Sequence, residues 1–211
     1  MTAKLSEIHT ARSVSRDPDK TRSLILDAAF QAIHRQGYQG MRLDDVVAAT
    51  GLTKGALYHH FPNKQALGYA VVDEVIRGII EQVWLQPLEA STDPLAEIIY
   101  FVGHMDALFG ARIVTFGCPV NNLAQEMSPL DEGFRTRLDK LYQEWRTGIQ
   151  HAIERARASG AVRSEIDAQK VASFVIAALA GCIGIAKNAQ SLEQLKTCAD
   201  GLIGYLESLR T

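Results

Sequence analysis

Cysteine is scarce in this sequence of 211 residues, and its three copies lie far apart along the chain. Cys118, Cys182 and Cys198 form no CxxC or CxxxC pair, which argues against a disulfide framework and against a structural zinc site. Such a sparse set is typical of reduced thiols in a cytoplasmic protein. We therefore expect no bound metal.

A secretory signal and a membrane span are also lacking. The first twenty residues contain no apolar segment of the kind that a signal peptide needs. The longest uncharged apolar stretch, residues 171–186, is shorter than the roughly 20 residues that cross a bilayer, and lysines bracket it. We interpret it as a buried helix, and we expect a cytoplasmic protein with no membrane partner.

Motifs of the common enzyme classes are absent as well. The sequence has no GxxxxGK, no GxGxxG and no GxSxG. A helical di-iron site would need repeated Glu-x-x-His motifs, and none occurs. We expect neither an enzyme nor a cofactor.

Charge of one sign is not in excess over the whole chain, whose formal net charge is −2. The charge is uneven, however: residues 1–64 contain 9 Lys and Arg against 6 Asp and Glu, and the remainder contains 13 against 18. This asymmetry indicates an N-terminal part that faces nucleic acid. Hydrophobic residues make up 47% of the chain, as in a soluble protein with a real core.

Helical periodicity dominates what is present, and no stretch alternates apolar and polar residues as a strand does. We therefore predict an all-α fold in which residues 1–16 form a flexible basic arm. Asp17-Pro18 predicts the start of a helix, and Gly37 predicts its end. Further helices are expected at 63–84 (ending before Pro87), 94–109, 131–159, 168–187 and 191–209, with a loop and one short helix between 111 and 129.

Two short helical segments, LDDVVAAT and KGALYHHF, follow the first helix and are joined by GLT. Gly51 suits the turn, Thr53 is placed to cap the second segment, and Phe61-Pro62 ends it. Two short helices with a glycine-containing turn predict a helix-turn-helix, whose second helix enters the major groove of DNA by its N-terminal residues.

The second helix of this pair has the surface chemistry of a DNA reader. Thr53 and Lys54 stand at its start, where backbone N–H groups and the helix dipole favour phosphate. Gly55 and Ala56 are small enough for close approach, and Ala56 is suited to a thymine methyl group. A structural hairpin with solvated basic residues is the alternative interpretation.

The stretch GMRLDDVVAATGLTKGALYHHFPNKQAL resembles the DNA-binding signature of the tetracycline-repressor (TetR) family, and the resemblance spans residues from about 20 to 67. It implies a helix-turn-helix DNA-binding domain at 17–64 and a larger helical domain for ligand binding and dimerisation at 65–211. The residues that it implies at the DNA are Thr53, Lys54, Gly55, Tyr58 and His59, with Lys64 on a phosphate.

Arg42 departs from the pattern of that family, which commonly has Ser or Thr at this position. An arginine cannot cap a helix as a hydroxyl does, but it can reach a phosphate. We therefore count Arg42 among the candidate DNA contacts and leave the capping of the helix that follows it open.

The segment ASFVIAALAGCIGIA is rich in alanine and glycine and is apolar around most of its circumference. A lone surface helix of this kind would leave apolar area in water, so we expect it to be buried against a second subunit. The family resemblance likewise implies a homodimer through residues about 168–209. A buried helix of a monomer is the alternative.

The C-terminal part also contains aromatic and polar residues of the kind that line a ligand pocket. The candidates are Trp84, Tyr100, His104, Phe109, Phe116, Asn122, Gln125, Trp145 and Phe174. Cys118 stands at an expected helix start, where the dipole lowers the pKa of a thiol, and is a candidate oxidant or electrophile sensor. A buried, inert thiol is the other interpretation of Cys118.

We therefore predict a homodimeric transcription regulator, a repressor that leaves a palindromic operator in double-stranded DNA when a small-molecule effector binds. Two hypotheses compete with this one. The first is a helical carrier or enzyme whose N-terminal hairpin is incidental. The second is an activator or a redox-controlled regulator.

Overall fold

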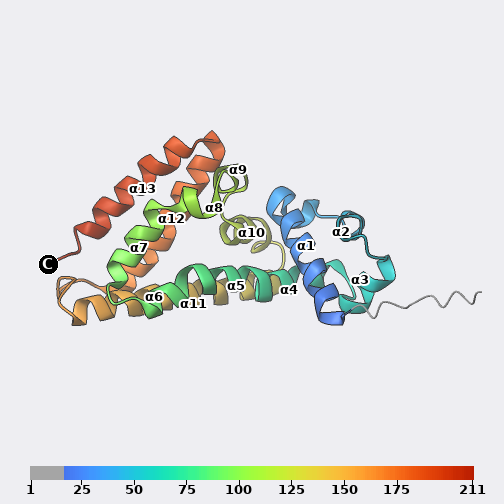
Figure 1. The fold of residues 1–211 in the computed structure, drawn as a ribbon, viewed down its shortest axis with the longest axis horizontal. Coiled ribbons are helices and arrows are strands. Elements are labelled where there is room, and N and C mark those ends of the chain that lie inside the picture. Colours follow the sequence, from blue (N-terminus) through green and yellow to red (C-terminus); the bar gives the residue numbers. More distant parts are fainter. Residues whose placement is uncertain (1–16) are drawn as a thin grey trace, which may run out of the picture.

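The computed structural model describes residues 17–211, and helices make up nearly all of this part of the chain (Figure 1). The expected basic arm, residues 1–16, lies outside the described residues. Between residues 17 and 211 the one piece of β structure is an isolated antiparallel bridge that pairs Val162 with Arg210. The all-α prediction is confirmed.

The helices α1 (Pro18–Gly40), α2 (Leu43–Thr50) and α3 (Lys54–His60) form the N-terminal end of the molecule. The Asp17 carboxylate caps α1 by accepting from the Asp19 N–H, and Pro18 follows in the first turn, as predicted. Regular helix in α1 stops at Gly37, where φ is +80°, so the predicted end is confirmed. Residues 38–40 form a further short turn.

One long helix connects this end to the rest of the molecule. It comprises α4 (Lys64–Ala70), a π-helical turn η1 (Val71–Ile76), α5 (Arg77–Ile80), a second π turn η2 (Glu81–Leu85) and α6 (Gln86–Ala90). The predicted end near Trp84 is wrong, because the helix continues through Pro87. A proline inside an α-helix clashes with the carbonyl four residues earlier, and the wider turn at η2 just before Pro87 relieves that clash.

The middle of the chain forms four short helices: α7 (Pro94–Gly103), α8 (Met105–Phe109), α9 (Arg112–Phe116) and α10 (Pro119–Met127). Two predictions need correction here. The single helix expected at 94–109 breaks at His104, and the stretch 111–129 contains two short helices where a loop and one helix were expected. Gly110 and Gly117 have positive φ values of 59° and 80°, which isolate α9 at both ends.

Three longer helices complete the fold: α11 (Glu132–Ala158), α12 (Ala168–Ala189) and α13 (Leu192–Glu207), close to the predicted bounds. By length and composition alone α12 is long and apolar enough to cross a membrane, a test that the core helix of a soluble protein also passes. Its inner face instead packs in the protein core, against α11 on one side and α13 on the other. That packing is typical of a core helix in a soluble protein.

A single hydrophobic core extends through the described residues from Ile25 in α1 to Leu209, two residues after the end of α13. Figure 1 shows how this core is arranged: α1–α3 lie at one end, the long α4–α6 helix and α11 run along one edge, and α12 and α13 lie toward the other end. The helices α8, α9 and α10 fill the space between the two ends. Helix α1 and the C-terminal helices are therefore packed as one body.

Candidate functional site

The second and third helices form the helix-turn-helix that the sequence predicts. Gly51 turns the chain in the left-handed conformation, with φ of 65°. The Thr53 hydroxyl caps α3 by accepting from the Ala56 N–H at 3.2 Å. Val46 of α2 and Leu57 of α3 are buried and hold the pair against α1. The opposite face of α3 is thereby left to solvent.

That free face carries most of the residues expected at the DNA. The exposed ones are Thr53, Lys54, Gly55, Tyr58 and His59, while Ala56 is partly covered. Tyr58, for example, keeps 51% of its surface exposed. His60 is half-buried, and its ring lies 6.5 Å from that of Phe61, so it does not belong to the exposed face.

Lys54 does not stand alone on this surface, because its ammonium group lies 2.7 Å from the Asp44 carboxylate of α2. The hydrogen bond and the charge of Lys54 hold the pKa of Asp44 below its usual value, and Asp44 raises the pKa of Lys54. Both side chains are well exposed. A phosphate that binds Lys54 must therefore displace a carboxylate that is already there.

Arg42 and Lys64 occupy the two flanks of the helix-turn-helix. Arg42 is exposed and makes no side-chain cap for α2, which answers the question left open by the sequence. Lys64 is half-buried: its ammonium group donates to the Gln39 carbonyl at 3.1 Å and lies 4.8 Å from the centre of the Tyr38 ring. Burial lowers the pKa of Lys64.

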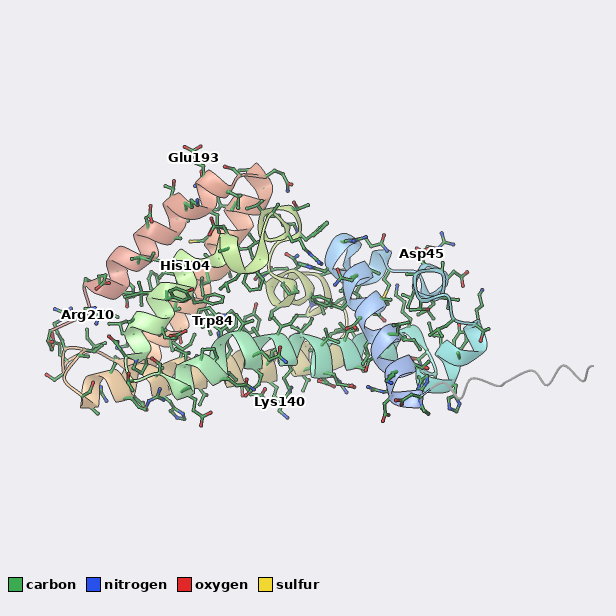
Figure 2. The ribbon with its side chains drawn as sticks, in the orientation of Figure 1. Asp45, Trp84, His104, Lys140, Glu193 and Arg210 are labelled. Carbon is green, nitrogen blue, oxygen red and sulfur yellow. The ribbon has the colours of Figure 1, made fainter. Side chains whose placement is uncertain are left out.

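Behind the DNA-binding helices lies a cavity of about 370 Å³. Its walls come from three parts of the chain: α1, the long connecting helix, and the helices that follow. Phe30, Gln31 and His34 line it from α1, and Trp84 and Trp145 line it from the other side. In Figure 2, Trp84 lies in the interior between α7 and the long helix. Most of the lining is apolar, as in small-molecule sites.

His34 connects this cavity to the short helices. Its Nε2 atom lies 2.8 Å from the Gly117 carbonyl oxygen, between α9 and α10. Since a carbonyl only accepts hydrogen bonds, Nε2 carries the hydrogen, and Nδ1 is an acceptor in the neutral ring. Burial lowers the pKa of His34, and the nearby charges of Arg112 and Lys187 lower it further, against the opposing effect of the Gly117 hydrogen bond.

Helix α10 reaches from the cavity to the end of α1. Cys118, Pro119 and Val120 at its start line the cavity. Near its other end the Glu126 carboxylate accepts from the backbone N–H groups of Tyr38 and Gln39, each at 2.8 Å. These two N–H groups follow the sharp bend at Gly37. One short helix therefore contacts both the cavity and the backbone of the DNA-binding end.

Comparison with known proteins gives a consistent picture. Residues 25–71 match the family model "Bacterial regulatory proteins, tetR family", and residues 94–202 match "Tetracyclin repressor-like, C-terminal domain". The HTH-type transcriptional regulator LmrA of Bacillus subtilis is 32% identical over 187 residues, which cover 87% of this chain and 96% of that protein. The HTH-type transcriptional repressor DhaR of a Mycobacterium species is 28% identical, with 83% and 88% covered.

The chain belongs to the TetR family of transcriptional regulators. Solved TetR-family structures agree with this assignment. A regulator from Cytophaga hutchinsonii superimposes with a TM-score of 0.83 at 22% identity, covering 92% of this chain and 96% of that one. One from Chloroflexus aurantiacus gives a TM-score of 0.79 at 26% identity, with 92% and 97% covered.

Membership of the TetR family makes this chain a soluble bacterial helix-turn-helix regulator that binds DNA, and not an enzyme. In the described part of the chain, no three His, Cys, Asp or Glu side chains gather as they would around a metal ion. The roles of the individual DNA-facing residues and the exact domain boundaries stay predictions.

The pocket residues predicted for this TetR-family regulator are only partly brought together. Trp84, Phe109 and Trp145 line the cavity. The other six do not line it: Tyr100, His104, Phe116, Asn122, Gln125 and Phe174. Helical periodicity does not say which side of a helix faces a cavity, and several of these residues turned out to be on outer faces.

Three contacts made elsewhere explain why four of those residues do not line the cavity. Tyr100 and His104 are exposed and stack on each other with ring centres 4.1 Å apart. Phe174 is 49% exposed and packs against Tyr205. Asn122 donates to the Phe116 carbonyl at 2.5 Å and supports the bend before α10. These contacts account for the absence of Tyr100, His104, Phe174 and Asn122 from the lining of this cavity.

Cys118 lies at the start of α10, as predicted, but its thiol behaves differently from the expectation. Burial raises the pKa of Cys118. The N–H groups of Asn121 and Val120 act in the opposite direction, but burial is the larger effect. A raised pKa agrees with the interpretation of Cys118 as a buried thiol, and Cys118 is a lining residue of the cavity.

Two residues that the sequence analysis missed are His34 and Glu126. Both act through partners that are distant in sequence: Gly117 is 83 positions from His34, and Tyr38 is 88 positions from Glu126. No local pattern marks them, because neither is a cap or part of a motif. The available signal for His34 was its place next to the apolar face of the first helix, four residues after Phe30.

Proposed function

We propose that this regulator is a homodimeric repressor that leaves a palindromic operator when a small molecule enters the cavity behind α1. The observation that carries the proposal is the shared wall of the cavity. Phe30, Gln31 and His34 belong to the first helix of the DNA-binding end, yet they line the same space as Trp84 and Trp145. A molecule bound there touches the DNA-binding end directly.

The contacts on both sides of α10 supply the means of coupling. An effector that shifts the start of α10 acts through the His34–Gly117 hydrogen bond on α1, and the Glu126 carboxylate transmits the same shift to Tyr38 and Gln39. The effector must bind the released conformation more tightly than the DNA-bound one, since only a difference in affinity shifts the equilibrium. A coupling of about 1–3 kcal/mol is typical.

The outer faces of α12 and α13 support the dimer. Phe174 and Ile185 of α12 are about half exposed, and Gly181 and Gly184 lie on the same side with open space around them. Gly201 and Gly204 give α13 a similar open surface. Small residues let helices approach closely, and two-fold symmetry would present two α3 helices to a palindrome about one DNA turn apart. Because its target is DNA, we place the regulator in the cytoplasm.

The test is a fluorescence-anisotropy titration against duplex DNA from upstream of the protein's own coding region, beside a scrambled duplex and across a salt series. We expect tight binding to one duplex and a steep fall in affinity with salt. Equal, weak binding to both would place the operator elsewhere and call for selection from random duplexes. Selected duplexes without two-fold symmetry would contradict the dimeric, palindromic proposal.

A further inference from the structure

Two residues that line the cavity each carry a buried nitrogen atom without a hydrogen-bond partner. Across residues 17–211, the buried side-chain nitrogen and oxygen atoms without a hydrogen-bond partner are Nδ1 of His34 and Nε1 of Trp145. Both residues line the same cavity, and Trp145 is only 5% exposed. Buried polar groups in native proteins are nearly always paired, so two unpaired atoms on residues that line one cavity point to a binding partner from outside the chain.

The two atoms need hydrogen-bond partners of opposite kinds, one an acceptor and the other a donor. The indole Nε1 of Trp145 carries a hydrogen and can only donate. Nδ1 of His34 is an acceptor, because Nε2 is the nitrogen that donates to the Gly117 carbonyl. A ligand that satisfies both must offer one hydrogen-bond acceptor and one hydrogen-bond donor, on a single hydroxyl group or on two groups.

The charge of the lining limits the ligand further. Among residues 17–211 no carboxylate lines the cavity, so no described group there would pair with a cation. Arg112 is the one charged lining residue; it is exposed, and its guanidinium already donates to the Gln31 side chain. The pKa of His34 is lowered by burial, which keeps that ring neutral near pH 7. The interior of the cavity therefore suits an uncharged molecule.

Apart from Gln31, Gln82 and Cys118, the remaining side chains of the lining are aromatic or aliphatic. Trp84 lies with its ring centre 3.9 Å from that of Phe101 and 5.3 Å from that of Trp145, and Phe30 and Phe109 complete the aromatic part. Such walls favour a flat ring system. A volume of about 370 Å³ is at the lower end of the range of about 300–1,000 Å³ for small-molecule sites.

We propose that the effector is an uncharged, mainly apolar ring compound that accepts a hydrogen bond from Trp145 Nε1 and donates one to His34 Nδ1. This inference rests on the proposed function, since it assigns a ligand class to the same cavity. It predicts that a hydroxyl group on an aromatic ring raises affinity and that a carboxylate lowers it. The ligand would bind in the interior, with Arg112 outside the contact.

Four matched probes test the class by isothermal titration calorimetry on the full-length protein: 2-naphthol, 2-methoxynaphthalene, naphthalene and 2-naphthoate. They share one ring system and differ in donor, acceptor and charge. We expect 2-naphthol to bind most tightly, at least tenfold better than naphthalene, because a site built for a hydroxyl discriminates against the analogue that lacks it. The acceptor-only ether should be intermediate, and 2-naphthoate should bind most weakly.

Trp145→Phe tests the assignment of the donor. It keeps an aromatic ring but removes Nε1, so we expect about three- to tenfold weaker binding of 2-naphthol and 2-methoxynaphthalene, and no change for naphthalene. Trp84→Phe is the comparison variant, because it makes the same change in the same cavity at an indole whose Nε1 is not among the buried unpaired atoms. It should affect all neutral probes alike.

Three results would overturn this inference: equal affinity for naphthalene and 2-naphthol, preferred binding of 2-naphthoate, or no binding of any probe. None of them decides the proposed function, which depends on whether any compound releases the operator duplex in the anisotropy assay. A protein that binds 2-naphthol as expected but keeps its operator under saturating 2-naphthol would support the ligand class and contradict effector-driven release by that class.

Discussion

At the scale of single residues, the surface expected to face DNA contains a carboxylate that competes with phosphate for Lys54. Asp44 of α2 holds the ammonium group of Lys54 at 2.7 Å, in a pair that is open to solvent. Exposed ion pairs of this kind contribute little to stability. Their effect on binding is different, because DNA must exchange with the carboxylate before Lys54 neutralises a phosphate.

The first prediction concerns this pair. Asp44→Asn should strengthen binding to any duplex by several-fold, since Lys54 no longer has to leave a carboxylate before it neutralises a phosphate. Lys54→Ala should weaken binding to all duplexes and lower the salt slope by about one. Salt-series anisotropy measures both effects. Asp45→Asn is the control that removes the same charge from the same helix, and an identical response of the two Asn variants would show that the ion pair is irrelevant.

The second prediction concerns the protonation of His34. Its pKa in the folded protein lies below the ordinary 6.5, so the unfolded chain binds the proton more readily. The stability that depends on neutral His34 is therefore complete above about pH 6.5 and is lost as the pH falls toward the lowered pKa of the folded state. Protonation also removes the Nδ1 acceptor that we assign to the effector.

Urea unfolding between pH 8 and pH 5 measures this effect, with His34→Gln as the reference. Glutamine retains an N–H donor for the Gly117 carbonyl but does not titrate in this range. We expect the free energy of unfolding of the wild-type protein to fall more steeply on acidification than that of His34→Gln. Parallel curves for the two proteins would contradict the assignment of the lowered pKa to His34.

At the scale of elements, α10 is the helix through which we expect the two ends to communicate. Glu126→Ala removes the carboxylate that accepts from the Tyr38 and Gln39 N–H groups. Loss of two charge-assisted hydrogen bonds should cost about 1–3 kcal/mol of stability and loosen the end of α1. The amides of Tyr38 and Gln39 should then exchange hydrogen faster, and operator affinity should change without loss of helix content.

Gln125→Ala serves as the control for Glu126→Ala, because Gln125 is the exposed neighbour on the same helix. Hydrogen exchange resolved by mass spectrometry or NMR, together with the anisotropy assay, separates the two variants. If protection at residues 38 and 39 is the same in Glu126→Ala and in the wild type, α10 does not hold the end of α1 and the coupling route is wrong.

The elements also show where sequence reasoning succeeds and where it fails. Caps and turns were read correctly at Asp17, Gly51 and Thr53, because each depends on residues within a few positions. The end predicted before Pro87 was wrong. The π turn η2 relieves the clash between the proline ring and the backbone, and no rule based on neighbouring residues predicts such a turn. Of the two glycines that isolate α9, the positive φ of Gly110 could not be predicted from the neighbouring residues, because it depends on packing.

At the scale of the whole molecule, the exposed face of α3 could be predicted from the sequence and the cavity could not. The face of α3 follows from a contiguous motif, and its residues are exposed as that motif implies. The cavity is built from residues as far apart as Phe30 and Ile183, so its lining depends on how six or more helices pack. Only the aromatic residues closest to the common core, Trp84 and Trp145 among them, were found by composition.

The last prediction addresses the assembly. The open sides of Gly181 and Gly184 on α12 would meet the second subunit in the proposed dimer. Within the described part of the same chain, no atom lies within 4 Å of a methyl group added at either position. Gly184→Trp should therefore fold normally as a protomer, because the ring extends into solvent and glycine is itself a poor helix former. It should nevertheless block the close approach of two α12 helices.

Sedimentation equilibrium of Gly184→Trp should give a monomer of about half the wild-type mass, with unchanged helical circular dichroism. Operator affinity should fall by at least tenfold, since one α3 helix then reads only half of a palindrome. Thr147→Trp, at an exposed position on α11, is the matched control and should remain dimeric with full affinity. If Gly184→Trp remains a dimer, the dimer interface does not include the glycine-bearing face of α12. A monomeric wild-type protein that still binds its operator tightly would instead remove the need for two recognition helices altogether.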